Sequence, residues 1–387
     1  MMRRRRLPLV AAFAAVLAGG TAASSGPPPA LMTVDVAVEQ PRPVVSPSQV
    51  VPWSLVRDVT AQDFDVFSDG TACPVESSST KGAPLSMVVL IDVSASTELT
   101  VDWLLEPLHT SLVPALKPGD RVAFGRFGGV ALHVDRRFSS LPDELREAAR
   151  SVLTLRRKAL EPRPPAGTPP ANGFGPVTPD PVVLVRGMNG AFGLGASPAW
   201  DAVDAAVSAL ESEPGRRAII LVTDGRSTGN VRSLEETILH AIAAEVGVFV
   251  VGEAQDEVIR QSRTIDAHVR PTAFLESMAA TTGGAYAAVF GPEPSRPKRI
   301  DALSSRPARE REGGEPLRPA RIDEGAFKKW VGRMMAAFVD DLHGACTLGF
   351  LAPALDGQIH TLDVRVRKPG LKVRARQRYF ARPRPAQ

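Results

Sequence analysis

Long apolar runs are scarce in this 387-residue sequence. A membrane-spanning helix needs about 20 consecutive apolar residues, and no stretch after residue 23 reaches that length. The apolar run Leu7–Leu17 follows four arginines and precedes small residues up to Ala23. Because this order is typical of a secretory signal, we expect residues 1–23 to be a cleaved signal peptide. The mature chain is then expected to be soluble and exported, to the periplasm or to the extracellular space.

Cysteine is nearly absent, since the chain has only Cys73 and Cys346. Neither lies near residue 23, so we do not expect lipid attachment at the predicted cleavage point. An exported protein can form a disulfide between the two. Two buried free thiols are the alternative, because pairing needs a geometry that the sequence does not show.

The sequence also lacks the short motifs of common enzymes. It contains no Gly-x-Ser-x-Gly elbow, no phosphate-binding loop and no Cys-x-x-Cys pair. The six histidines have no metal-ligand spacing; they are His109, His133, His240, His268, His343 and His360. We therefore assign no catalytic nucleophile and predict that the protein is not an enzyme.

Charge of one sign is not in large excess. The 46 basic and 42 acidic residues leave a net charge of +4, which equals the charge of the four arginines at positions 3–6. The mature chain is thus near neutral, and we expect no nucleic-acid partner. Seven basic residues do gather near the C-terminus, namely Arg365, Arg367, Lys368, Lys372, Arg374, Arg376 and Arg378. We predict that they form the solvated outer face of a strand pair; attraction to an anionic cell-surface polymer or an acidic partner is the alternative.

Strand-like and helix-like segments alternate through the middle of the chain. The apolar run Met87–Ile91, which ends in Asp92, is typical of a strand buried on both faces. Four further strands are expected at 121–127, 218–222, 246–251 and 286–290, and helices at 101–116, 141–155, 199–210, 234–244 and 273–280. This alternation predicts an α/β fold with a doubly wound, mostly parallel sheet over residues 84–291.

The flanks of this region have other patterns. Residues 31–80 predict a short N-terminal β segment, and residues 323–381 predict one helix followed by three strands. A proline-rich insertion at 162–181 and a linker at 292–322 have compositions that do not pack a core. Because each flank is too small to fold alone and exposes strand edges, we predict that the N- and C-terminal strands form one smaller β-rich unit.

Oxygen-bearing side chains follow two strands of the predicted sheet. Asp92, Ser94 and Ser96 come after the first buried strand at alternate positions, and Asp224 comes after a later one. Ligands bind at the carboxyl ends of strands in such sheets, and carboxylates with hydroxyls suit a hard divalent cation. Singly, each residue has an ordinary explanation as a helix cap or a turn. Jointly they predict a metal site.

The segment Asp92-Val93-Ser94-Ala95-Ser96 resembles the metal-ion-dependent adhesion site of the von Willebrand factor A family. The resemblance covers about residues 85–290. It implies a bound divalent ion, Mg²⁺ before Mn²⁺ or Ca²⁺, with one coordination position open to an Asp or Glu side chain of a partner protein. The ligands that it implies are Asp92, Ser94, Ser96, Ser197 and Asp224. Ser197 stands where the family usually has Thr, so a hydroxyl is retained there.

The flanks are similar to those of a narrower group, the bacterial exported proteins related to this family. Residues 59–70 resemble that group's L-T-x-x-D-F-x-V-x-x-D-G segment, and residues 348–350 and 364–381 resemble its closing strands. The resemblance implies an exported, metal-dependent protein-binding module of the adhesion type. One alternative is a non-catalytic envelope scaffold whose metal is structural or absent. Another is a magnesium-assisted hydrolase, which would need a general base near the ion.

Overall fold

The structure is a computed structural model that describes residues 30–41, 53–94, 97, 101–128, 132–160, 197–225, 227–253, 271–289, 323–353 and 355–383. Four parts of the sequence predictions lie outside these ranges. They are the signal peptide, Ser96, the proline-rich insertion 162–181 and the linker 292–322.

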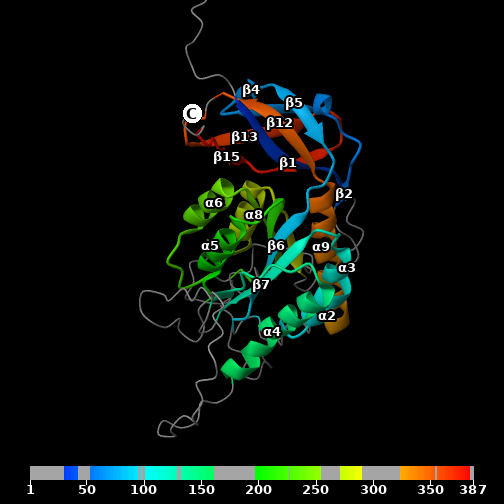
Figure 1. The fold of residues 1–387 in the computed structure, drawn as a ribbon, viewed down its shortest axis with the longest axis vertical. Coiled ribbons are helices and arrows are strands. Elements are labelled where there is room, and N and C mark those ends of the chain that lie inside the picture. Colours follow the sequence, from blue (N-terminus) through cyan, green and yellow to red (C-terminus); the bar gives the residue numbers. More distant parts are fainter. Residues whose placement is uncertain are drawn as a thin grey trace, which may run out of the picture.

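A six-stranded sheet with the order β11-β10-β9-β6-β7-β8 forms the larger part of the described chain (Figure 1). Five strands run parallel; they are β6 (Leu85–Asp92), β7 (Arg121–Phe127), β9 (Arg216–Thr223), β10 (Val246–Glu253) and β11 (Tyr286–Val289). The edge strand β8 (His133–Val134) is antiparallel to β7. These two residues are too few to give a strand signal in the sequence.

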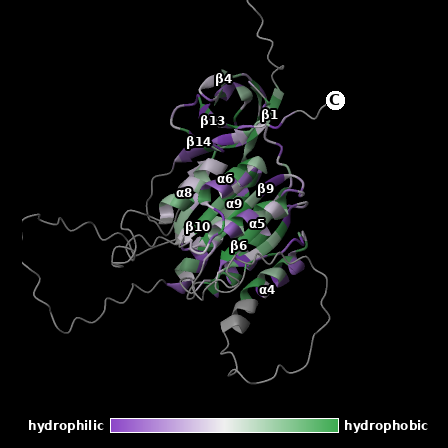
Figure 2. Cartoon of the chain, turned by 90° about the vertical axis from the view of Figure 1, so that its left-hand side faces the viewer, coloured by the Kyte–Doolittle hydropathy of each residue, from purple (hydrophilic) through white to green (hydrophobic). Residues whose placement is uncertain are grey.

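Apolar cores cover both faces of this sheet, and hydrophobic residues follow its central strands (Figure 2). Alternate residues of β6 belong to different cores: Met87 and Val89 to one, Val88 and Leu90 to the other. The second core contains α5 (Ala199–Leu210), α6 (Leu234–Ala243) and α8 (Pro271–Thr282). An unbroken apolar run therefore forms a central strand because it meets helices on both sides.

The first core contains two long helices, α4 (Pro142–Leu160) and α9 (Glu324–Gly344). Phe327, Val331 and Phe338 of α9 pack among residues of the sheet. This helix therefore covers the sheet, although residues 292–322 separate it from the sheet's strands in the sequence. The predicted helix 101–116 is broken into α2 (Leu105–Pro107), the π-helix η3 (Leu108–Leu112) and α3 (Val113–Ala115). None of the helices in the described ranges has the length and apolar character needed to cross a membrane.

The two ends of the chain meet in a β-rich unit above the sheet in Figure 1. One sheet contains β1 (Ala30–Pro41), β2 (Trp53–Leu55), β5 (Val75–Ser79), β12 (Cys346–Ala352) and β14 (Lys372–Ala375). The other contains β3 (Phe64–Ser68), β4 (Thr71–Cys73), β13 (Ile359–Val366) and β15 (Arg378–Phe380), with the 3-10 turn η1 (Ala61–Asp63) before β3. Because β1 pairs with β12 and β3 with β13, both sheets combine N- and C-terminal strands, as the sequence predicts.

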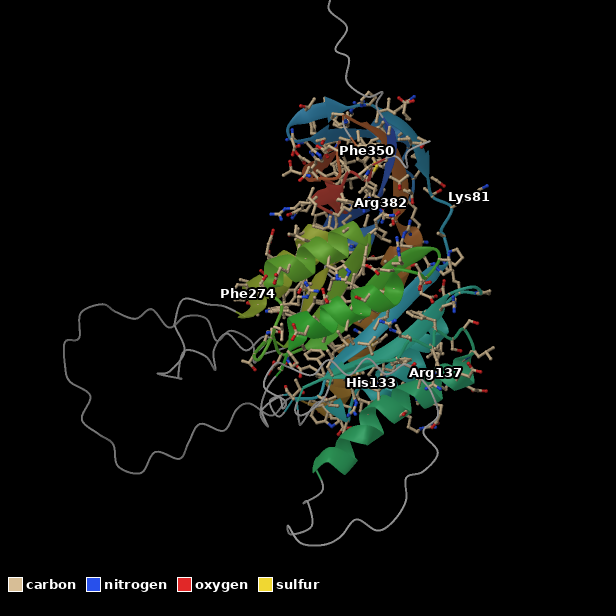
Figure 3. The ribbon with its side chains drawn as sticks, turned by 60° about the vertical axis from the view of Figure 1, so that its left-hand side comes forward. Lys81, His133, Arg137, Phe274, Phe350 and Arg382 are labelled. Carbon is tan, nitrogen blue, oxygen red and sulfur yellow. The ribbon has the colours of Figure 1, made fainter. Side chains whose placement is uncertain are left out.

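A third apolar core lies within this unit and includes Phe64, Leu348 and Phe350. Figure 3 shows Phe350 there and Arg382 next to the helices of the larger unit. Arg382 Nη2 donates a 2.9 Å hydrogen bond to the carbonyl of Ala243, at the end of α6. The two units are therefore joined by polar contacts as well as by the chain.

Part of the predicted basic outer face is buried between the units. Arg365 and Arg367 are 64% and 58% exposed, as expected, but Arg374 and Arg376 are only 14% and 11% exposed. The prediction was wrong for these two because the end of β14 and the turn after it pack against the end of α8. In that turn Gln377 N donates to the carbonyl of Thr281 at 3.0 Å. The larger unit thus covers the side of β14 that the alternating pattern assigned to solvent.

Both cysteines are buried in the third core, and they are not joined in a disulfide. Cys346 lies opposite Val36 on β1, whereas Cys73 lies opposite Val66 on β3, in the other sheet. Burial raises the pKa of each thiol. The structure thus has the second of the two arrangements that the sequence left open.

Candidate metal site

Two carboxylates meet at the carboxyl ends of neighbouring parallel strands. Asp92 is the last residue of β6, Asp224 follows β9, and these strands pair side by side. Each residue is only 1% exposed. The amino ends of the same strands face the β-rich unit, since Arg216 at the start of β9 bonds to Asp35 of β1. The carboxylates therefore lie at the end of the sheet far from that unit.

Hydrogen bonds from Ser94, Ser197 and Thr223 hold the Asp92 carboxylate. Its Oδ1 accepts from the backbone N of Ser94 at 2.9 Å. Its Oδ2 accepts from Ser197 Oγ at 3.0 Å and from Thr223 Oγ1 at 2.7 Å. These donors are neutral, so none of them compensates the negative charge.

Burial raises the pKa of Asp92 to about 6, and the nearby charge of Asp224 adds to the rise. The hydrogen bonds from Ser94 and Thr223 act in the opposite direction but do not restore the usual value of 3.8. Ionisation of Asp92 is therefore less favourable here than in water, and a nearby positive charge would favour it.

The first loop is held in place by its own polar groups. Thr97 Oγ1 donates to the carbonyls of Asp92 and Ser94, at 2.9 and 3.0 Å. Gly128, at the end of β7, has a φ of +112°, and a Cβ there would lie 2.6 Å from Ser94 N. Only glycine leaves room for the loop at this point.

Ser197 is placed by the loop that follows Asp224. Its backbone N donates to Thr228 Oγ1 at 3.1 Å, and its carbonyl accepts from Thr228 N at 2.8 Å. Asn230 Oδ1 accepts from Trp200 N at 2.9 Å in the first turn of α5, and Asp201 of the same turn accepts from Val231 N. The start of α5 is thus tied to the loop that carries Asp224.

The structure brings four of the five predicted ligands into one region: Asp92, Ser94, Ser197 and Asp224. Ser96 lies outside the described ranges. The described ranges contain no group of three or more His, Cys, Asp or Glu side chains that could hold a metal ion. A cation between Asp92 and Asp224 would therefore need hydroxyl ligands as well. This is the donor set of carboxylate and hydroxyl oxygens that Mg²⁺ accepts.

Sequence reasoning missed two residues that position these groups. Thr223 was visible as a hydroxyl at the end of a strand, directly before Asp224, which is a usable signal. Thr228 lies in an irregular loop, and its bonds to Ser197 depend on two segments about 30 residues apart meeting in space. Nothing in the local pattern indicates that contact.

Comparisons with known proteins give no match to a family model and none among curated proteins. Solved structures do match. BatB of Bacteroides thetaiotaomicron is 15% identical, with 53% of this chain and 90% of that chain covered and a TM-score of 0.34. A von Willebrand factor type A protein from Catenulispora acidiphila is 12% identical, with 67% and 51% covered and a TM-score of 0.31. Human Sec24c of the COPII coat is 11% identical, with 77% and 44% covered and a TM-score of 0.38. Since these scores are low, the role of the site is inferred from the residues and geometry of the chain itself.

Proposed function

We propose that residues 84–291 form a von Willebrand factor A-type domain with a doubly wound sheet. In this proposal the protein is exported and is a binding module, not an enzyme. A divalent cation, most readily Mg²⁺, is held at the ends of β6 and β9, and it binds an Asp or Glu side chain of a partner protein. The observation that carries the proposal is the buried pair Asp92 and Asp224, whose mutual repulsion helps to raise the pKa of Asp92.

The residues present fit such an ion. Two carboxylates buried side by side cost free energy unless a cation lies near them. Asp92, Ser94, Ser197 and Asp224 would hold the ion together with Ser96 of the same loop. The ion would supply a positive charge and a coordination position for an oxygen ligand from outside. Because the hydroxyl ligands are neutral, the ion would keep its attraction for a further carboxylate.

The position of the site also suits a binding role. Ligands of open α/β sheets bind beyond the carboxyl ends of the strands, and the β-rich unit lies at the opposite end (Figure 1). A partner could therefore reach the site without displacing that unit. Fixed hydrogen bonds to Asp92 and to the start of α5 would keep the ligand oxygens in place before the ion binds.

The proposal is tested by calorimetric titration of Mg²⁺ into the wild type, Asp92→Ala and Asp143→Ala. Asp143 is the matched control, because its side chain on α4 is 98% exposed. We expect Asp92→Ala to lose Mg²⁺ binding while its far-UV circular dichroism stays that of the wild type, and Asp143→Ala to bind normally. Unchanged Mg²⁺ affinity in Asp92→Ala would show that the site is assigned wrongly.

Partner binding needs a second experiment, in which immobilised protein captures proteins from an envelope extract. We expect a partner that is retained with Mg²⁺, is released by a chelator and is not retained by Asp92→Ala. A partner that stays bound in chelator and to Asp92→Ala would favour the scaffold alternative. Turnover of a phosphate or carboxylate ester that needs Asp92 would favour the hydrolase.

A further inference from the structure

A polar cavity of about 110 Å³ lies between the β-rich unit and the amino ends of β9 and β10. One water molecule needs about 10–15 Å³ on this measure, so the cavity has room for several waters or one small polyatomic ion. Four arginines line it: Arg216, Arg217, Arg374 and Arg376. It lies at the other end of the sheet from Asp92 and is independent of the proposed metal site.

Two of these arginines have close carboxylate partners. Arg216 makes two 2.8 Å bonds to the carboxylate of Asp35, from Nε and from Nη2. Arg374 bonds to Glu39 at 2.7 Å and to Asp341 at 2.6 Å. Their charges are compensated within hydrogen-bond distance.

The other two arginines share a single carboxylate, that of Glu245. The distances are longer, 3.5 Å from Arg217 Nη2 and 3.7 Å from Arg376 Nη1. Arg376 Nη2 donates to the carbonyl of Thr33, but its buried Nε has no hydrogen-bond partner among the described residues. One carboxylate lies between these two guanidinium groups, whereas Arg374 has two carboxylates, so the charges around the cavity balance in number. The unsatisfied need is at Arg376 Nε, because a buried donor without an acceptor costs free energy.

The backbone holds these three residues at the cavity. Glu245 has a φ of +56°, in the left-handed region that favours glycine, and it follows Ala244, the C-cap of α6. Gly283 has a φ of +82°, and a Cβ there would lie 2.7 Å from Arg376 N. The turn that carries Arg376 is therefore packed directly against the end of α8.

We propose that this cavity binds a small tetrahedral oxyanion, phosphate or sulfate, between Arg217 and Arg376. The anion accepts hydrogen bonds from both guanidinium groups, and Glu245, whose side chain is 36% exposed, turns toward solvent. Because Arg217 belongs to β9 and Arg376 to the turn between β14 and β15, the bound anion links the two units. Occupancy then stabilises their contact, since a ligand of the native state raises its stability.

The test is calorimetric titration of inorganic phosphate into the full chain, in chloride buffer of constant ionic strength with a chelator present to exclude metal. We expect the wild type to bind phosphate and Arg217→Met to bind it about tenfold or more weakly, through loss of a charge-assisted hydrogen bond. Glu245→Gln should bind more tightly than the wild type, because it removes the competing carboxylate. Arg365→Met, which changes an exposed arginine on β13, should bind like the wild type.

Arg376→Met removes a buried group and is checked by circular dichroism before it is titrated; Arg217 and Glu245 provide the test if it does not fold. Titration of glycerol phosphate distinguishes a site for phosphate esters from one for the free ion. The proposal is overturned if the wild type gives no phosphate binding. It is equally overturned if Arg217→Met and the wild type bind alike, since phosphate then binds elsewhere on the protein.

Discussion

Ser197 Oγ donates a 3.0 Å hydrogen bond to Oδ2 of Asp92, although 105 positions separate the two residues in the chain. The bond joins the start of α5 to the end of β6. Thr223 donates to the same oxygen from the end of β9. One carboxylate oxygen is thus fixed by hydroxyls from two other segments, which sets its direction before any ligand arrives.

This relationship predicts how Ser197 variants bind metal. Ser197→Ala should weaken Mg²⁺ affinity about 10- to 100-fold, as is usual when a ligand or its support is removed. Ser197→Thr keeps the hydroxyl and should stay within a few-fold of the wild type. Ser208→Ala, on the helix α5 that follows Ser197, is the control. The variants are compared by calorimetry, and wild-type affinity in Ser197→Ala would remove this residue from the ligand set.

The buried contact between the units predicts a large effect for Arg374. Arg374→Met leaves the carboxylates of Glu39 and Asp341 without their cation, so we expect a loss of about 3–5 kcal/mol in the free energy of unfolding. Arg365→Met, at an exposed site, should change it by less than about 0.5 kcal/mol. Urea denaturation at neutral pH measures both. Equal, small losses would show that the Arg374 network contributes little to stability.

Asp341 gives this prediction a pH dependence. Burial raises its pKa to about 6 even though Arg374 lowers it. A raised carboxyl pKa means that the native state binds protons more readily than the unfolded state, so stability increases as pH falls through 6 toward the ordinary value of 3.8. Without Arg374 the pKa should rise further. Part of the stability lost in Arg374→Met should therefore return between pH 7 and 5, and denaturation midpoints in that interval check it.

His360 joins β13 to the turn after β3 and predicts a pH effect of the opposite sign. Its Nδ1 lies 2.6 Å from Asp69 Oδ2, and its Nε2 lies 3.0 Å from Asp356 Oδ1. The hydrogen bond from His360, with those from Thr361, lowers the pKa of Asp69 to about 2. Asp356 and then Asp69 raise the pKa of His360. The contribution of Asp69 to stability is therefore present above about pH 4 and lost as pH falls toward 2.

The contribution of His360 has its own window, present below its unfolded pKa of about 6.5 and lost as pH rises through the higher folded value. His360→Gln should abolish that alkaline loss and move the pKa of Asp69 back toward 3.8. Carboxyl ¹³C titration by NMR measures the shift. His240→Gln, which changes a histidine on α6, should leave Asp69 as it is; an unmoved Asp69 in His360→Gln would contradict the assignment.

The two buried thiols predict a simple chemical result. Cys73 and Cys346 should both react with a thiol reagent in denaturant without prior reduction, and react slowly in the native protein, because burial hinders access and raises their pKa. Counting reactive thiols per chain in both conditions checks this. No reaction in denaturant until a reductant is added would show a disulfide instead.

The sequence by itself determined the features that depend on local pattern. The run Met87–Ile91 predicted a strand buried on both faces, since only helices on both sides of a sheet use residues that are apolar without alternation. Alternating apolar residues near the two ends of the chain predicted strands. Each end has too few strands to fold alone, which predicted that they form one unit. Asp92 and Asp224 were identifiable as candidates because each directly follows a strand of a predicted parallel sheet.

The tertiary structure alone decided which groups meet. Thr228 holds Ser197 through a contact between two loops, and no local spacing records it. The alternation of basic and apolar residues predicted that Arg374 and Arg376 lie on one side of the strand pair. It did not predict that α8 and α9 cover that side. Local pattern fixes the direction of a side chain, whereas burial depends on what the rest of the chain places opposite it. Glu245 lies between Arg217 and Arg376 for the same reason, since the three residues come from segments that are distant in the sequence.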